Sequence, residues 1–156
     1  MTSPAATGSV QLAVIPGDGI GQEVTPEALK VLEAAAEVFG FATRRTDYPY
    51  GSEHFLKTGE ILPDAAFDEI RGQAAVFLGA IGDPRLPVGK IEYGIIARLR
   101  FDLDLYINLR PIKLYPGVEC PLRDKGPDDI DLVVVRENTE DLYTGGGGFL
   151  RKGTPQ

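Results

Sequence analysis

The sequence predicts an α/β fold with a mostly parallel sheet and flanking helices. Strand and helix patterns alternate over the first hundred of its 156 residues, which is typical of a parallel sheet. The first strand, Val10 to Ile15, is a short apolar run that ends in a glycine-rich turn. The strongest strand pattern lies at Ile130 to Val135. The length fits one domain or two small ones.

A helix is expected after the glycine-rich turn, because apolar side chains recur there at helical spacing. They are Ala28, Leu29, Leu32, Ala35, Ala36 and Phe39. Thr25 before Pro26 predicts the start of this helix, since threonine caps helices and proline favours the first helical position. Gly40 predicts its end.

Further elements follow in the same alternation. Strands are expected at 41–50, 74–78 and 106–109, the last with a continuation at 112–115 after a bend at Arg110-Pro111. Helices are expected within 51–63, at 63–70 and at 91–103, and residues 116–129 form a loop.

Composition and charge argue against several classes of protein. Sixteen lysine and arginine residues against 23 acidic residues give a net charge of −7, which argues against nucleic-acid binding. Aliphatic runs are only a few residues long, so no membrane helix is expected. Met1 to Ser9 has neither a basic start nor an apolar stretch and does not resemble a secretory signal. With the single cysteine, Cys120, these features indicate the cytoplasm.

Three glycines, Gly17, Gly19 and Gly21, lie between the first strand and the first helix. This context is typical of dinucleotide-binding loops, but the third glycine is too early and no acidic residue ends a second strand about 20 residues later. We interpret the glycines as a tight turn. A nucleotide- or phosphate-binding module built on glycine turns is an alternative.

Arg100, Arg110 and Arg136 are candidate ligand-binding residues. Arg100 lies toward the end of a helix, whereas Arg110 and Arg136 end strands. Strand ends in an α/β sheet face the ligand crevice, and each guanidinium can pair with a carboxylate through two hydrogen bonds. Convergence of these arginines would suit a di- or tricarboxylate. Taken singly, each arginine also fits a solvated surface charge.

Three further features have a functional and a structural interpretation. Tyr143 could donate a proton if nearby charge lowered its pKa, although packing tyrosines are commoner. His54, the only histidine, fits a surface residue better than a metal ligand. Gly145 to Gly148 fits a hairpin tip better than an anion-binding nest.

Five pieces of sequence, in this order, resemble the N-terminal part of the β-decarboxylating dehydrogenases, the isocitrate/isopropylmalate dehydrogenase family. They are Leu12–Val24, Phe77–Pro84, Leu99-Arg100, Asn108–Pro111, and Val135–Glu140 with Tyr143 after it. The resemblance runs from about Leu12 to Pro155. It implies the fold of that family, incomplete here, which is not a Rossmann fold although it binds NAD.

The resemblance also implies the roles of individual residues. The cofactor NAD would lie near its nicotinamide end against Gly79, Ala80, Ile81, Gly82, Asp83, Pro84 and Glu92. The carboxylates of a small dicarboxylate substrate would be held by Arg100, Arg110 and Arg136. Tyr143 would donate a proton to the carbon that loses carbon dioxide.

The implied reaction is the NAD-dependent oxidative decarboxylation of 3-isopropylmalate, a step of leucine biosynthesis. Mg²⁺ or Mn²⁺ would act as Lewis acid between hydroxyl and carboxylate. Family members are more than twice as long, and their base lysine, metal aspartates and adenosine loop would lie beyond Gln156. No metal ligand is therefore assigned here, and this stretch alone is expected to be inactive.

The resemblance further implies two domains and a homodimer. Residues 1–104 would form part of the first, NAD-side domain, and residues 105–156 would begin the second, which binds substrate and makes the dimer.

Two positions depart from the family pattern. Asp141 stands where glycine is usual, which puts an acid near an anionic substrate. The segment from Gly94 to Arg100 has one residue more than in many isopropylmalate enzymes and matches tartrate- or malate-type relatives. Such a substrate, recognised near Ile95 and Ile96, is therefore an alternative. A non-catalytic chain that binds a dicarboxylate or a full-length partner is another.

Overall fold

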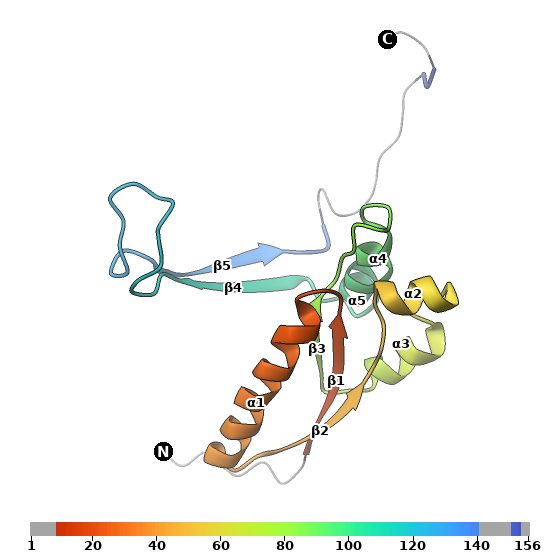
Figure 1. The fold of residues 1–156 in the computed structure, drawn as a ribbon, viewed down its shortest axis with the longest axis horizontal. Coiled ribbons are helices and arrows are strands. Elements are labelled where there is room, and N and C mark those ends of the chain that lie inside the picture. The colour runs from red at the N-terminus through yellow and green to blue at the C-terminus, as the bar shows by residue number, and fades with distance from the viewer. Residues whose placement is uncertain (1–8, 141–150, 154–156) are drawn as a thin grey trace. The chain divides into compact units, whose positions relative to one another are not determined.

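The computed structural model describes residues 9–140 and 151–153. The chain divides into two compact units, Met1–Arg98 and Leu99–Gln156. The first unit contains a three-stranded sheet and the second a two-stranded sheet (Figure 1). In the described part of the chain, no helix is long and apolar enough to cross a membrane.

The sheet of the first unit is parallel, as the alternation of strands and helices predicts. Its strands are β1 (Ser9–Gly17), β2 (Ala42–Asp47) and β3 (Ala75–Ala80), in the order β2-β1-β3. The centre of β1 is fully buried, from Leu12 to Ile15. An uninterrupted apolar run suits a central strand because side chains on both of its faces are covered.

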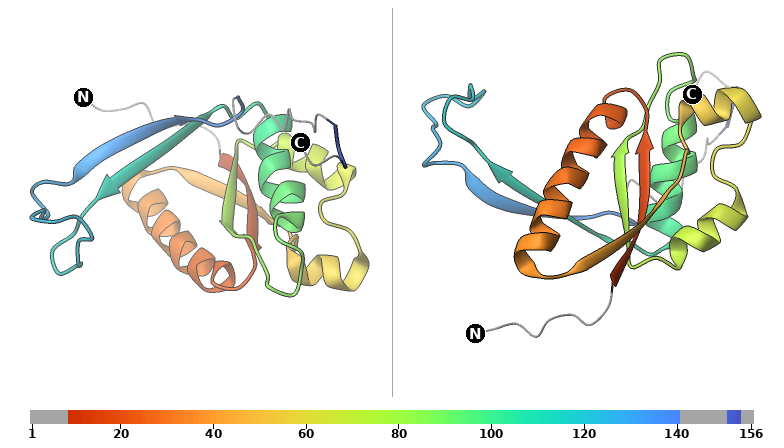
Figure 2. Two further views of the ribbon diagram at one scale, coloured as in Figure 1. Left: turned by 90° about the horizontal axis from the view of Figure 1, so that it is seen from above. Right: turned by 60° about the horizontal axis from the view of Figure 1, so that its bottom comes forward.

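Helices cover both faces of this sheet. They are α1 (Gly21–Phe39), α2 (Ser52–Thr58), α3 (Asp64–Arg71) and α4 (Lys90–Glu92). Helix α1 packs against all three strands, and α3 and α4 lie on the other side of them (Figures 1 and 2). The chain passes from β1 to β2 in one direction and from β2 to β3 in the other, so β1 is a switch point of the topology. Ligand crevices form at the carboxyl ends of strands at such points.

Helix α1 begins earlier than the sequence predicts. Thr25 and Pro26 lie inside the helix instead of at its start. The reason is that the glycine turn itself forms the first helical turn, since the N–H of Gln22 donates to the carbonyl of Gly19 at 3.1 Å. The predicted end is confirmed: Gly40 adopts the left-handed conformation with φ 70°, which glycine accommodates without strain.

The predicted helix at 91–103 contains a π-helical turn. After α4, residues Tyr93–Ala97 form the wide turn η1, and α5 (Arg98–Asp102) follows in sequence. A π turn accommodates one additional residue in a helix, so the helical spacing of side chains changes within Tyr93–Ala97. Within the turn Ile95 is fully buried, whereas Ile96 is partly exposed.

The sheet of the second unit is antiparallel. Its strands are β4 (Ile107–Lys113) and β5 (Asp131–Glu137), with Asn108 opposite Arg136 and Arg110 opposite Val134. The predicted bend at Arg110-Pro111 is wrong, because β4 runs through both residues. A proline is tolerated on an edge strand, and both strands of a two-stranded sheet are edge strands.

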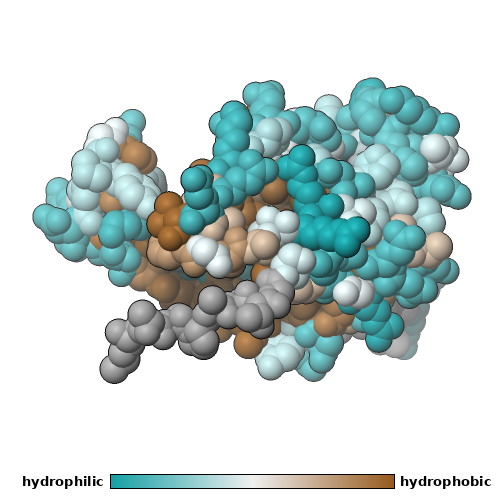
Figure 3. Space-filling model, turned by 90° about the horizontal axis from the view of Figure 1, so that it is seen from below, coloured by the Kyte–Doolittle hydropathy of each residue, from teal (hydrophilic) through white to brown (hydrophobic). Residues whose placement is uncertain are grey.

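Many apolar side chains of the described residues are exposed. On one face of β4 and β5 these are Ile107, Leu109, Val133 and Val135, and on α1 they include Val31, Val38 and Phe39. Hydrophobic side chains accordingly reach the surface in the space-filling view (Figure 3). Exposed apolar faces and open strand edges favour association.

We expect the isolated 156-residue chain to aggregate or to melt without a sharp transition. The unpaired edges of β2 and β3 and the exposed face of β4 and β5 are the physical reason. Size-exclusion chromatography and thermal melting measure both properties. A monodisperse monomer with a cooperative melt would contradict the prediction.

Candidate functional site

The glycine-rich turn after β1 packs directly against the end of β3. Gly17 pairs with Ala80 in the sheet, and the N–H of Asp18 donates to the carbonyl of Ala80 at 2.6 Å. A side-chain Cβ on Gly17 would lie 2.1 Å from the Ala80 oxygen, and one on Gly21 would lie 2.2 Å from the Pro16 oxygen. Gly17 also has φ +75°. The interpretation of these glycines as a tight turn is therefore confirmed.

Asp18 holds this turn in place, a role that the sequence analysis missed. Its side chain is buried, with 7% of the residue exposed. One carboxylate oxygen accepts a hydrogen bond from the Ser52 N–H at 2.6 Å, and the other accepts from the Ser52 hydroxyl at 2.8 Å and from the Gly82 N–H at 3.0 Å. An acid between two glycines at the end of a buried strand was the signal available in the sequence.

The predicted cofactor residues fall into two groups. Gly79, Ala80 and Ile81 lie beside the glycine turn, at or just after the end of β3. The remaining four residues line a hollow of about 440 Å³ together with Leu86, Pro87, Val88 and Ile91; they are Gly82, Asp83, Pro84 and Glu92. The structure thus brings these four residues together.

Gly82 leaves open space inside this hollow. Its φ is +143°, and a Cβ there would lie 3.3 Å from a carboxylate oxygen of Glu92. A residue with a side chain would be strained at this φ and would crowd Glu92. The backbone of Gly82 is therefore accessible to a close-fitting group.

Ionic contacts surround Asp83. Arg85 donates from Nε and Nη2 to its carboxylate at 2.9 and 2.6 Å, and Nη2 also contacts Glu53 in the first turn of α2. Hydrogen bonds from Arg85 lower the pKa of Asp83 to about 2 and also lower the pKa of Glu53. The network joins the hollow to α2, but its exposure to solvent weakens it.

The structure places two of the three candidate arginines on one face of the second sheet. Asn108 is opposite Arg136, and Arg110 is two residues from Asn108. Side chains two residues apart share a face, so Arg110 and Arg136 are diagonal neighbours, a spacing that long side chains bridge. Arg100 lies on another element, the last turn of α5, and is partly exposed.

Two asparagines orient Arg110. Its Nε donates to Oδ1 of Asn108 at 3.0 Å, and Nδ2 of Asn108 donates to Oδ1 of Asn138 at 3.4 Å. Asn138 is buried, and its N–H donates to the carbonyl of Tyr106 at 2.9 Å. The contact at Nε leaves the two terminal nitrogens of Arg110 to form a fork for a carboxylate. Both asparagines belong to the sequence pieces that carry the family resemblance.

The turn after Arg136 is built around the Glu137 carboxylate. It accepts hydrogen bonds from the hydroxyl of Thr139 at 2.7 Å, from the Thr139 N–H at 2.9 Å and from the Glu140 N–H at 2.7 Å. These donors, the Thr139 side chain foremost, lower the pKa of Glu137 to about 2. The turn thereby fixes the end of the strand that carries Arg136.

We expect this turn to loosen in acid. Glu137 has a pKa near 4.3 in an unfolded chain and about 2 in the fold. Because the folded pKa is the lower one, its contribution is complete above about pH 4.3 and is lost as the pH falls toward 2. Hydrogen exchange at Thr139 and Glu140, corrected for the intrinsic effect of pH, should lose protection in this window.

The matched variants are Glu137→Gln and Glu119→Gln. The first should reduce protection of Thr139 and Glu140 already at neutral pH, because an amide cannot accept three hydrogen bonds in the same way. The second removes an exposed acid in the 114–130 loop and should change nothing. Protection in the unaltered chain that stays constant from pH 4.3 to pH 2 would contradict the assignment.

The structure describes only some of the other residues singled out in the sequence. Tyr143 and Asp141 lie outside the described residues. His54 is half-buried instead of lying at the surface, because its ring packs edge-on against Tyr50 with centroids 5.0 Å apart. The described residues contain no group of three or more histidine, cysteine or acidic side chains that could hold a metal. The Mg²⁺ or Mn²⁺ site therefore stays a prediction.

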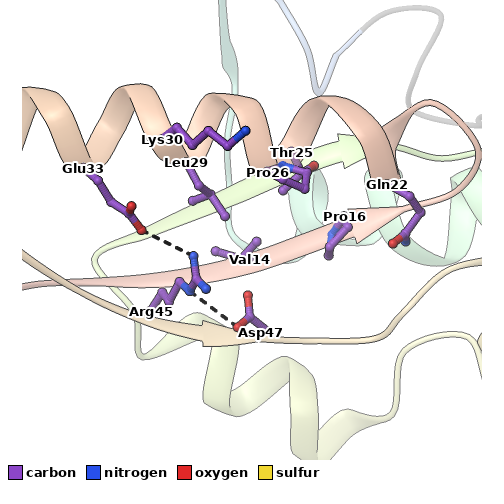
Figure 4. A pocket seen from close by; sticks show the side chains of 10 residues that line it. All are labelled: Val14, Pro16, Gln22, Thr25, Pro26, Leu29, Lys30, Glu33, Arg45 and Asp47. Carbon is purple, nitrogen blue, oxygen red and sulfur yellow. Dashed lines mark ion pairs between the residues drawn. The ribbon is translucent and has the colours of Figure 1, made fainter.

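A second hollow, of about 320 Å³, lies between α1 and strands β1 and β2 (Figure 4). Val14 and Leu29 supply apolar side chains to it, and Arg45 contacts Glu33 at 3.7 Å and Asp47 at 3.6 Å. Three of its ionic side chains are thus paired with one another, and the fourth, Lys30, pairs with Glu27 at 2.5 Å. We therefore place the candidate cofactor site at the carboxyl ends of β1 and β3 and the candidate substrate residues on β4 and β5.

Comparison with known proteins gives the class of the chain. The family model for isocitrate/isopropylmalate dehydrogenase matches residues 11–152. The chain belongs to this family.

Two similar curated proteins have the same name. A 3-isopropylmalate dehydrogenase of Thermobifida fusca is 54% identical over 147 residues, and one of Mycobacterium avium is 56% identical over 146. Each alignment covers 94% of this chain and 42% of the relative. The chain thus spans less than half the length of these relatives.

Solved structures confirm the fold. Isocitrate dehydrogenase from Methylococcus capsulatus matches with a TM-score of 0.70 and 36% identity, over 87% of this chain and 37% of that one. A β-decarboxylating dehydrogenase from Thermococcus kodakarensis matches with a TM-score of 0.61 and 35% identity, over 84% and 34%. The predicted isocitrate/isopropylmalate dehydrogenase-like fold, incomplete in this chain, is therefore correct.

Proposed function

We propose that this chain is the N-terminal part of an NAD-dependent dehydrogenase that oxidises and decarboxylates 3-isopropylmalate. The observation that carries the proposal is the pair Arg110 and Arg136 on one face of β4 and β5, in a chain 53–56% identical to proteins named for this activity. Two guanidinium groups at this spacing suit the carboxylates of a small dicarboxylate.

The arginines bind and orient the substrate. Arg110, with Nε held by Asn108, presents its terminal nitrogens to one carboxylate, and Arg136 and Arg100 neutralise the remaining negative charge. The 2-hydroxyl would lose its proton to a base, and the carbon that carries it would lose a hydride. The 3-carboxyl then leaves as carbon dioxide, and the electron pair left on that carbon takes a proton from Tyr143.

We assign the hollow at Gly82 to the nicotinamide end of NAD. Gly82 has no side chain to fill the space in front of Glu92, and Asp83 and Pro84 complete the wall. When bound, NAD accepts the hydride. We assign Gly79, Ala80 and Ile81 to the support of this wall, since they lie against the glycine turn.

Groups outside the described residues complete the proposal. Mg²⁺ or Mn²⁺, with ligands from such groups, would supply Lewis-acid chemistry. We further propose that the complete enzyme is a cytoplasmic homodimer that binds neither nucleic acid nor membranes, in keeping with the net charge of −7.

A tartrate- or malate-type substrate is the second candidate. It is favoured by the additional residue between Gly94 and Arg100, which coincides with the π-helical turn η1. Such a turn changes which side chains of the helix share a face. The pocket for the substrate's side chain would then differ from that of an isopropylmalate enzyme.

A chimera tests the proposed function. Residues 1–156 are followed by the part of the Thermobifida fusca relative that lies beyond the matched segment, and NADH formation is measured with Mg²⁺ or Mn²⁺. We expect 3-isopropylmalate to be the best substrate among isopropylmalate, malate, tartrate and isocitrate. A higher kcat/KM for malate or tartrate would favour the second candidate. A folded chimera that turns over none of them would support a non-catalytic chain.

A further inference from the structure

We propose that Asp18 is a positioning residue for the cofactor site: its buried carboxylate holds the backbone of Gly82 in the conformation that keeps the hollow open. The structural part of this inference rests on the hydrogen bonds of Asp18. Its consequence for NAD rests on the proposed function.

The Asp18 carboxylate joins three segments that are distant in the sequence. It belongs to the turn after β1, and its partners are Ser52, the first residue of α2, and Gly82, just after β3. Ser52 is completely buried. A buried carboxylate is stable only when it is hydrogen-bonded, and the backbone N–H groups of Ser52 and Gly82 together with the Ser52 hydroxyl meet this need.

The space around Asp18 fits an aspartate closely. A Cβ on Gly51 would lie 2.8 Å from one carboxylate oxygen and 3.2 Å from the carbonyl carbon of Gly17. The glycine before α2 therefore lets the helix approach the turn. A longer acidic side chain at position 18 would push these segments apart, since packed interiors yield little to added atoms.

The bond to Gly82 determines the direction of the chain that follows. With its N–H directed at Asp18 and φ at +143°, Gly82 turns the backbone so that Asp83 and Pro84 form the wall of the hollow. A second connection runs from α2 through Glu53 and Arg85 to Asp83. It is weaker because the side chains of Glu53 and Arg85 are 60% and 55% exposed. The connection through the buried Asp18 carboxylate is therefore the one that positions Gly82.

Asp18→Asn in the chimera is the test. Asparagine has the same size as aspartate. Both carboxylate oxygens of Asp18 accept from backbone N–H groups, whereas the NH₂ group of asparagine is itself a donor and cannot accept a hydrogen bond. Because the hydrogen bond from Gly82 to a carboxylate is stronger than one between neutral groups, we expect its loss to raise KM for NAD at least about 10-fold. KM for 3-isopropylmalate should stay within about twofold, and the Gly82 amide should exchange at least about 10-fold faster.

Two further variants complete the experiment. Asp64→Asn alters an exposed carboxylate that pairs with Arg98 and should leave every parameter within about twofold. Ser52→Ala removes one of the three bonds and should raise KM for NAD and the exchange rate of Gly82 by a smaller factor. If Asp18→Asn does not fold, Ser52→Ala decides the outcome.

Unchanged exchange at Gly82 together with an unchanged KM for NAD would overturn the proposal. Equal increases in KM for NAD and in KM for 3-isopropylmalate would also overturn it, because they would indicate a general structural role of Asp18. If the unaltered chimera neither binds NAD nor turns over substrate, the proposed function fails. Exchange at Gly82 in the same variants then still decides whether Asp18 holds this segment.

Discussion

Arg110→Lys in the chimera should lower kcat/KM for 3-isopropylmalate about 10–100-fold, on the order of 1.4–2.7 kcal/mol of transition-state stabilisation. KM for NAD should remain nearly unchanged. Lysine keeps the positive charge but lacks the planar fork and the Nε that bonds to Asn108. Steady-state kinetics with substrate and NAD varied separately measure the two effects.

The geometry of β4 explains why this effect should be large. Arg110 lies within a continuous strand before Pro111, which biases it toward an extended backbone, and the Asn108–Asn138 pair holds its guanidinium. A rigidly held fork loses more when it is replaced than a mobile one.

Arg123→Lys makes the same exchange at an exposed position of the 114–130 loop and serves as the control. It should leave kcat/KM for 3-isopropylmalate unchanged. If Arg110→Lys also stays within twofold of the unaltered chimera, Arg110 does not bind substrate. The assignment of the three arginines to the carboxylates would then be wrong.

The fold of the first unit could largely be predicted because its signals are local. The apolar run in β1 is a buried central strand, and Gly40 ends α1 through its own backbone conformation. The start of α1 could not be found from residue preferences alone. Thr25 and Pro26 are typical of a helix start, but the glycine turn already provides helical hydrogen bonds before them.

The candidate site could be predicted only in part, because its supporting contacts join distant segments. Asp18 and Gly82 are 64 residues apart, and nothing in the spacing of either residue indicates the other. The sequence predicts that Arg110 and Arg136 end strands, but both lie inside β4 and β5, and their shared face depends on the antiparallel register of these strands. The sequence pattern identifies residues that could bind a ligand or take part in catalysis. Strand pairing determines which of these residues lie close together.

The 156-residue chain on its own should form NADH from 3-isopropylmalate at least about 10⁴-fold more slowly than the chimera. The family resemblance implies that the base lysine and the metal-binding aspartates lie in the part of the relatives that this chain does not match. This part is 58% of the relative's length, because the match covers 42% of it. General-base catalysis contributes up to about 10⁴-fold, and a Lewis-acid metal contributes further.

The measurement is NADH formation by the chain alone, by the C-terminal part of the Thermobifida fusca relative alone, and by the chimera, at equal concentrations with Mg²⁺ or Mn²⁺. Only the chimera should be active, and turnover by the isolated chain near that of the chimera would show that its own residues supply both the base and the metal site.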